Sequence, residues 1–77
     1  MAQAYILIQT EVGKATTIAE RIRQLPGVIT AENVVGPYDV VVRIDGNGDP
    51  GSSPALTGIQ QVAGITRTLT CEVPARA

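Results

Sequence analysis

The chain has 77 residues, with six basic and seven acidic side chains, one cysteine and no histidine. The basic residues are scattered, which argues against nucleic-acid binding, and the longest apolar run, residues 5–8, is far shorter than the ~20 residues that span a bilayer. A lone cysteine allows no intrachain disulfide and, without histidine, argues against a zinc or copper site.

The first two predicted elements are a strand and a helix. Residues 4–10 (AYILIQT) are apolar and β-branched without helical spacing, which predicts a strand buried on both faces. In residues 14–25 (KATTIAERIRQL), Ile18, Ile22 and Leu25 recur at helical spacing. This spacing predicts an amphipathic helix.

A hairpin is predicted next. Proline disfavours helix in the residue before it and glycine tolerates the exit conformation, so Pro26-Gly27 ends the helix. Residues 28–35 (VITAENVV) predict a second strand. Residues 38–44 (YDVVVRI) predict a third strand, which returns through a tight turn at Gly36-Pro37.

The composition then becomes rich in glycine, serine and proline. Residues 45–54 (DGNGDPGSSP) predict a loop, and residues 55–62 (ALTGIQQV) predict a short helix with its apolar side chains inward. Residues 64–73 (GITRTLTCEV) alternate between polar and apolar and predict the last strand. Residues 74–77 form a tail.

A weak internal repeat supports this order of elements. Each half reads helix, turn, strand, with QLPGV in the first half and QVAGI in the second. Three pairs of similar residues are separated by 37 positions: Ile22 and Ile59, Leu25 and Val62, Gly27 and Gly64. Two βαβ units with right-handed crossovers predict an α+β fold, a ferredoxin-like βαββαβ plait with a four-stranded antiparallel sheet and both helices on one face.

The other face of such a sheet is bare. Side chains alternate between faces along a strand, and we expect the helices to cover the side of the last strand that carries Cys71. The bare face would then carry Val34, Val41, Thr66, Thr68, Thr70, Glu32, Arg43 and Asp39. This mixture of apolar and charged residues predicts an oligomer interface. A core this small contributes only about 3–5 kcal/mol, which also favours oligomerisation.

Three stretches resemble the effector-binding (RAM) domain of the Lrp/AsnC family of transcription regulators. They are AYILIQTEVGK, LPGVITAENVVGPYDVVVRI and GITRTLTCEV, and together they cover about residues 4–73. The resemblance implies the same plait, dimers that pair through their sheets, and rings of four dimers. It also implies amino-acid effectors bound at interfaces between dimers and a cytoplasmic location, which the unpaired cysteine and the lack of a signal peptide also favour.

Two features depart from the family pattern. Full members carry a DNA-binding helix-turn-helix before this domain, whereas residues 1–77 read as a single module that opens on its first strand. The family also has a longer charged helix where this chain has the glycine-rich stretch at 45–54. We therefore expect a stand-alone domain, and the size of its assembly stays open.

Asp39 is the first candidate site residue, because a carboxylate beside a run of valines is costly to bury without a partner. Its carboxylate could accept hydrogen bonds from the ammonium of an amino acid. The alternative is a turn residue that accepts nearby backbone N–H groups. The resemblance to the family in GPYD favours the ligand role. Gly36 would permit close backbone approach, and Tyr38 would either close a pocket or pack in the core.

The threonines of the last strand are the second candidate. Hydroxyls at alternate positions could bind a ligand carboxylate, although threonine also simply favours strands. The resemblance in ITRT favours Thr66 and Thr68 over Thr70. Glu32 and Arg43 are expected to pair across the hairpin.

The sequence leaves three functions to consider. The first is an amino-acid-binding and oligomerisation module, and the second is a ligand-independent assembly partner of full-length Lrp/AsnC regulators. The third, a cofactor-free enzyme, is disfavoured because the chain has no histidine and no obvious carboxylate pair. We therefore expect a homodimer or a ring of dimers, with no catalytic residue, cofactor, metal, direct nucleic-acid contact or membrane contact.

Overall fold

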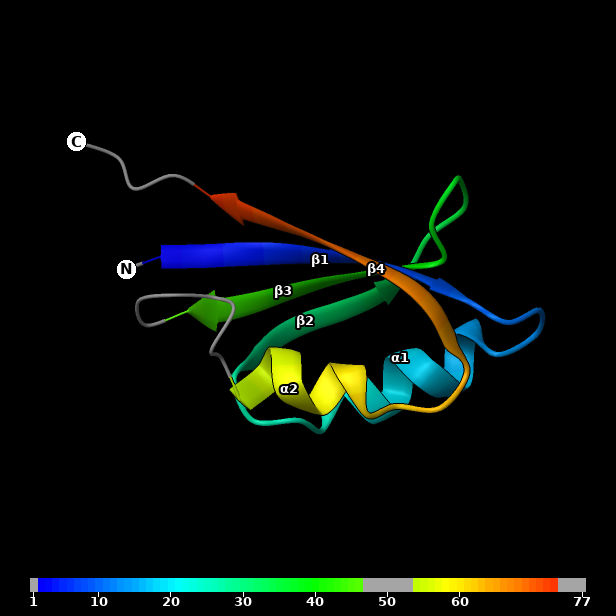
Figure 1. Ribbon diagram of the computed structural model, residues 1–77, viewed down its shortest axis with the longest axis horizontal. Helices are drawn as coiled ribbons and strands as arrows, with labels where there is room; N and C mark the ends of the chain where they lie inside the picture. The colour runs from blue at the N-terminus through cyan, green and yellow to red at the C-terminus, as the bar shows by residue number, and fades with distance from the viewer. Residues whose placement is uncertain (1, 47–53, 74–77) are drawn as a thin grey trace.

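The computed structural model describes residues 2–46 and 54–73. Its elements are, in chain order, β1 (Ala2–Thr10), α1 (Ala15–Arg23), β2 (Val28–Asn33), β3 (Val40–Gly46), α2 (Pro54–Gln60) and β4 (Ile65–Val73). The strands form one antiparallel sheet in the order β2-β3-β1-β4, with both helices on one side (Figure 1). The predicted βαββαβ plait is confirmed. Most of the predicted loop at 45–54 and the predicted tail at 74–77 lie outside the described residues.

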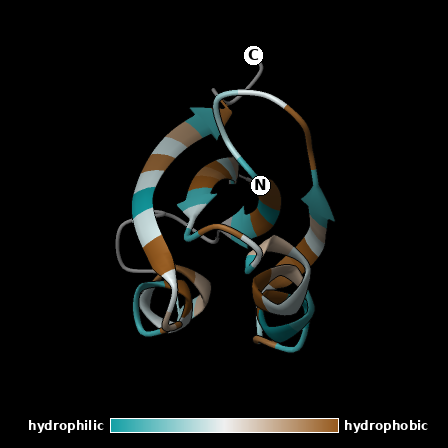
Figure 2. Cartoon of the chain, turned by 90° about the vertical axis from the view of Figure 1, so that its right-hand side faces the viewer, coloured by the Kyte–Doolittle hydropathy of each residue, from teal (hydrophilic) through white to brown (hydrophobic). Residues whose placement is uncertain are grey.

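The core lies between the helices and the sheet. Figure 2 shows the helices side by side beneath the curved sheet, with hydrophobic and hydrophilic bands alternating along the strands. Fully burying an isoleucine contributes about 1.5–3 kcal/mol, so the buried apolar side chains of this core supply most of the stabilisation of the fold. The buried set consists of Ala4, Ile6, Ile8, Ile18, Ala19, Ile22, Ala31, Val40, Val42, Ile44, Ala55, Leu56 and Ile59.

The internal repeat is visible in the backbone. After α1, the Leu25 N–H donates to the Ile22 carbonyl at 3.0 Å, and after α2 the Val62 N–H donates to the Ile59 carbonyl at 3.0 Å. The turn then passes through a glycine of positive φ in each half, Gly27 at 87° and Gly64 at 95°. Glycine reaches such angles without steric cost.

Each turn glycine also packs against the other half of the molecule. A Cβ placed on Gly27 would lie 3.3 Å from the Ala55 Cβ, and a Cβ on Gly64 would lie 3.0 Å from the Ile18 Cδ1. Ile18 and Ala55 are themselves separated by 37 positions, so the two contacts are equivalent. The two halves therefore hold each other through matching helix–turn contacts.

We expect Gly64→Ala to lower the free energy of unfolding by about 2–3 kcal/mol. A positive φ costs an L-residue about 1–2 kcal/mol, and displacing the buried Ile18 side chain adds about 1 kcal/mol. Gly13→Ala is the control, because Gly13 has φ 79° but nothing lies within 4 Å of its added Cβ. Urea unfolding of both variants at one protein concentration would measure the difference. Equal losses would mean that Ile18 accommodates the methyl group.

A β-bulge reverses the expected faces of β4. Arg67 is opposite Gln9 on β1, whereas Ile65 is opposite Thr10, so Thr66 is an extra residue. Ile65 therefore points to the core, and the alternation of side chains is inverted from Arg67 onward.

The expected positions of Cys71 and the threonines were consequently wrong. Thr68 is opposite Ile8 and Thr70 is opposite Ile6, so both lie on the helix-facing side of the sheet. Cys71 is exposed and lies on the bare side. β2 has a similar irregularity between Val28 and Thr30, which leaves Ile29 46% exposed.

The bare side of the sheet carries an apolar surface, which we call the uncovered sheet face. It consists of Tyr5, Leu7, Val41, Leu69, Cys71 and Val73. The first strand is thus covered by the helices on one face only, and Tyr5 is 38% and Leu69 46% exposed.

Arg43 borders this face, and its interaction partners differ from the predicted one. Its guanidinium lies 5.9 Å from the centre of the Tyr5 ring and donates to the Gln3 side chain, with the Nε–Oε1 distance at 3.0 Å. Its partner across the hairpin is Thr30, while Glu32 is opposite Val41. The expected pairing of Glu32 with Arg43 was wrong because the hairpin register places Arg43 opposite Thr30, two residues along β2 from Glu32.

Candidate functional site

Asp39 lies at the end of the sheet where β1 stops and β3 starts. The strand begins at Val40, not at residue 38, so Tyr38 and Asp39 belong to the preceding loop. The Asp39 N–H donates to the Ile8 carbonyl at 2.8 Å, and the Asp39 carbonyl accepts the Val34 N–H at 2.9 Å. These bonds close the β2–β3 hairpin and fix the Asp39 backbone against β1.

The Asp39 carboxylate continues the β1–β3 ladder beyond its last backbone pair. Its Oδ2 atom accepts the Thr10 N–H at 2.9 Å, and the Thr10 hydroxyl lies 3.5 Å from the same atom. A hydrogen bond to a charged group contributes about 1.5–3 kcal/mol when partly buried. Asp39 therefore has a structural role of the kind expected of a turn residue, although the N–H it accepts comes from a neighbouring strand.

The loop before Asp39 is held to the same strand. The Gln9 side-chain amide donates to the Pro37 carbonyl at 2.8 Å. Gly36 is exposed and Tyr38 is half-buried on this loop. We call Thr10 and the loop from Gly36 to Asp39 the Asp39 corner.

The two predicted threonines lie at the same end of the sheet but on another strand. Thr68 is opposite Ile8 on β1, and Ile8 is opposite Val40 on β3. Thr68 is half-buried on the helix-facing side, and Thr66 is exposed in the bulge. Neighbouring strands lie about 4.8 Å apart, so β1 separates the threonines from Asp39 by roughly 10 Å.

Thr10 and Gln9 are site residues that the sequence analysis did not identify. Both contact the Asp39 loop directly, through the Thr10 N–H and the Gln9 amide. The signal was present in the sequence, since antiparallel pairing of the first and third strands brings the polar end of one, residues 9–10, beside the polar start of the other, residues 38–39.

The chain matches the sequence pattern of one protein family. The pattern of the Lrp/AsnC ligand binding domain matches residues 3–73. No curated protein matches the chain. No helix in residues 2–46 or 54–73 is long and apolar enough to cross a membrane.

Solved structures agree with the fold. TTHA0845 from Thermus thermophilus is 28% identical, with a TM-score of 0.87, over 100% of this chain and 98% of that one. The hypothetical protein PHS023 from Pyrococcus horikoshii is 27% identical, with a TM-score of 0.85, over 99% and 93%. The transcriptional regulator NMB0573 from Neisseria meningitidis, solved as an L-Met complex, is 17% identical with a TM-score of 0.70 over 96% of this chain and 50% of that one. That last likeness concerns the fold alone.

Proposed function

The chain belongs to the Lrp/AsnC ligand-binding domain family, and from this premise we propose that it binds an amino-acid effector at the Asp39 corner, at an interface between subunits of a homo-oligomer. The observation that carries the proposal is the placement of the Asp39 carboxylate by two backbone bonds and the Thr10 N–H. An ionised carboxylate has about four acceptor positions, so it can accept a ligand ammonium in addition to Thr10.

We infer that the remaining polar groups of the site contact the other end of the amino acid. The Thr68 and Thr66 hydroxyls lie across β1 from Asp39 and can donate to a ligand carboxylate. Gly36 and Tyr38 would contribute the neighbouring wall. NMB0573, which shares the fold, is described as a complex with L-Met, and this makes amino acids the first ligands to test.

The uncovered sheet face supports the oligomer. Leu69, Tyr5 and Val73 are each more than a third exposed on one face, and soluble monomers rarely expose contiguous apolar surface of this kind. We infer that a second copy covers this face and that dimers associate further into a ring, which would place Asp39 corners at the contacts between dimers.

The second candidate function rests on the same face. A ligand-independent partner of full-length Lrp/AsnC regulators would cover the uncovered sheet face with a regulator subunit in place of a second copy of this chain. In either case we infer that residues 1–77 act as one module in the cytoplasm, without catalysis, and influence transcription through their partners.

A thermal-shift screen against the twenty amino acids at millimolar concentration would test the ligand role. A ligand at 100 times its Kd stabilises the native state by about 2.7 kcal/mol, so a true effector should raise Tm clearly above the values for the other amino acids. Light-scattering mass measured on the same samples should show an oligomer. A stable oligomer with no Tm shift would contradict the ligand role. A monomer would contradict the homo-oligomer on which the first function rests, and co-purification with a full-length regulator would then support the second.

A further inference from the structure

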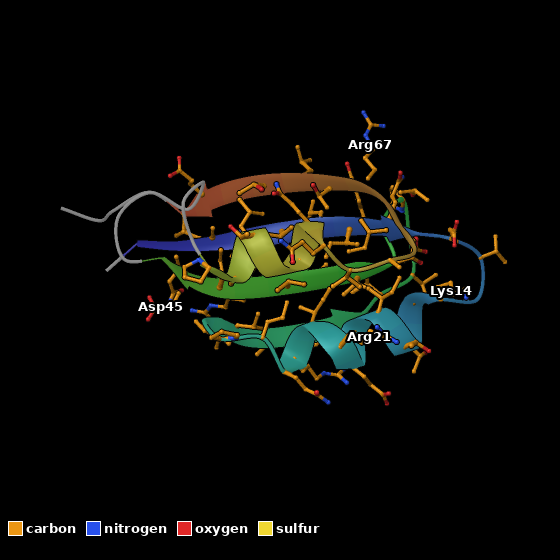
Figure 3. All side chains as sticks on the ribbon, turned by 60° about the horizontal axis from the view of Figure 1, so that its bottom comes forward. Lys14, Arg21, Asp45 and Arg67 are labelled. Atoms are coloured by element: carbon orange, nitrogen blue, oxygen red, sulfur yellow. The ribbon has the colours of Figure 1, made fainter. Side chains whose placement is uncertain are left out.

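A hollow lies between α1 and the loop that leads into β4. It has a volume of about 180 Å³. Lys14, Thr17 and Arg21 line it from α1 and its start, at the spacing of one helix face. Its other walls are Glu11, Ile18 and the Ala63-Gly64 turn. Figure 3 shows Lys14 and Arg21 on the same side of the molecule, at α1.

The hollow has a net positive charge. Lys14 and Arg21 are both exposed, and within the described residues neither side chain forms an ion pair. Among the residues that the structure describes, Glu11 is the one acidic group that lines the hollow. The first turn of α1 holds no acidic residue and no side-chain cap, so its backbone N–H groups add a partial positive charge.

The internal repeat indicates that the fold does not need these charges. At the repeat spacing of 37 positions, Arg21 in the first half corresponds to Gly58 in the second, and Gly27 corresponds to Gly64. The two halves therefore contain equivalent helix–turn contacts. In the equivalent contact the Leu25 side chain packs at 3.1 Å from where a Gly58 Cβ would stand. The second half therefore has an apolar contact at the position where this hollow has the Arg21 guanidinium.

We propose that this hollow is a binding site for a small oxyanion, the phosphate or carboxylate group of a small molecule, held by Lys14, Thr17 and Arg21. An ammonium, a guanidinium and a hydroxyl are the donors that such groups take. The volume is below the ~300–1,000 Å³ of drug-sized pockets, which restricts the ligand to a small one. The site uses neither Asp39 nor Thr68, so it stands or fails independently of the amino-acid site.

Glu11 allows a test in which a substitution strengthens anion binding. Glu11 lines the same hollow and its negative charge opposes an anion there, so removing its charge should strengthen binding while removing either cation should weaken it. We expect Arg21→Gln and Lys14→Gln each to raise the Kd about three- to tenfold, and Glu11→Gln to lower it by a similar factor.

NMR titrations of the ¹⁵N-labelled full chain with inorganic phosphate, and separately with succinate, would test this at constant ionic strength set with sodium chloride. The expected result is saturable shifts of the Thr17, Arg21 and Gly64 amides with at least one anion. Arg67→Gln is the matched control: it makes the same charge change, and Figure 3 shows Arg67 pointing away on the opposite side of the molecule. Its Kd should stay within about twofold of the wild type.

The titrations also separate the two sources of the oxyanion. Binding of phosphate alone indicates a phosphorylated ligand, and binding of succinate alone indicates a carboxylate; both support the site. The proposal is overturned if neither anion saturates, or if Arg21→Gln and Arg67→Gln weaken binding equally. An unchanged Kd in Glu11→Gln would also contradict it. A dispersed amide spectrum for each variant establishes that it is folded.

Discussion

Replacing Asp39 with alanine should lower the free energy of unfolding by about 1–3 kcal/mol and abolish effector binding. The change removes the carboxylate that accepts the Thr10 N–H at 2.9 Å and leaves that half-buried donor without its partner. Urea unfolding would measure the stability loss, and the amino acid that raises Tm in the screen would measure binding. This variant alone does not separate the structural role of Asp39 from the ligand role.

Asp39→Asn separates the two roles. The amide oxygen of asparagine can still accept the Thr10 N–H, so we expect a stability loss below about 1 kcal/mol. The charge is gone, and losing a charge-assisted bond of about 1.5–3 kcal/mol to the ligand ammonium should weaken binding about ten- to a hundredfold. If Asp39→Asn binds the effector as tightly as the wild type, the carboxylate serves the fold only and the proposed contact is wrong.

Replacing Leu69 with arginine should convert the proposed oligomer to monomers. Leu69 lies on β4 at the edge of the uncovered sheet face, opposite Leu7 on β1, and is 46% exposed in the single chain. A second copy on this face would bury the new charge without a partner. That costs several kcal/mol, so we expect the dissociation constant of the dimer to rise at least about a hundredfold.

The control for that variant is Val12→Arg. Val12 is 101% exposed in the loop between β1 and α1, so the same charge is added away from the uncovered sheet face. Sedimentation velocity across a range of concentrations would compare the two variants with the wild type. An unchanged mass for Leu69→Arg, with an unchanged circular dichroism spectrum, would show that another surface holds the subunits together.

The order of elements was predictable because each element carries its own local signal. The repeat of Gly27 and Gly64 fixed both helix ends to within a few residues, and both glycines have the positive φ that their position after a helix suggests. The alternation along β4 was also correct. What the sequence did not contain was the phase of that alternation relative to β1, because Thr66 has no feature that marks it as the extra residue of a bulge.

The candidate site was predictable in part for a similar reason. Asp39 stands out as a charge beside Val40, Val41 and Val42, and this contrast is a property of the sequence alone. Its partner Thr10 is separated from it by 29 residues and is brought near only by the pairing of β1 with β3. Contacts of this kind depend on strand register, which one bulge can shift.

The antiparallel pairing of β1 with β4 also has a consequence for how binding could be read out. Gln3 is opposite Val73, whereas the Asp39 N–H binds the Ile8 carbonyl, five residues further along β1. At ~3.4 Å per residue, the Gln3–Val73 pair and the corner are roughly 17 Å apart along the sheet. A reporter or a DNA-binding segment joined at either end would stand clear of a ligand bound in its own subunit. Ligand binding would affect such an attached segment by changing the spacing and angle between neighbouring subunits.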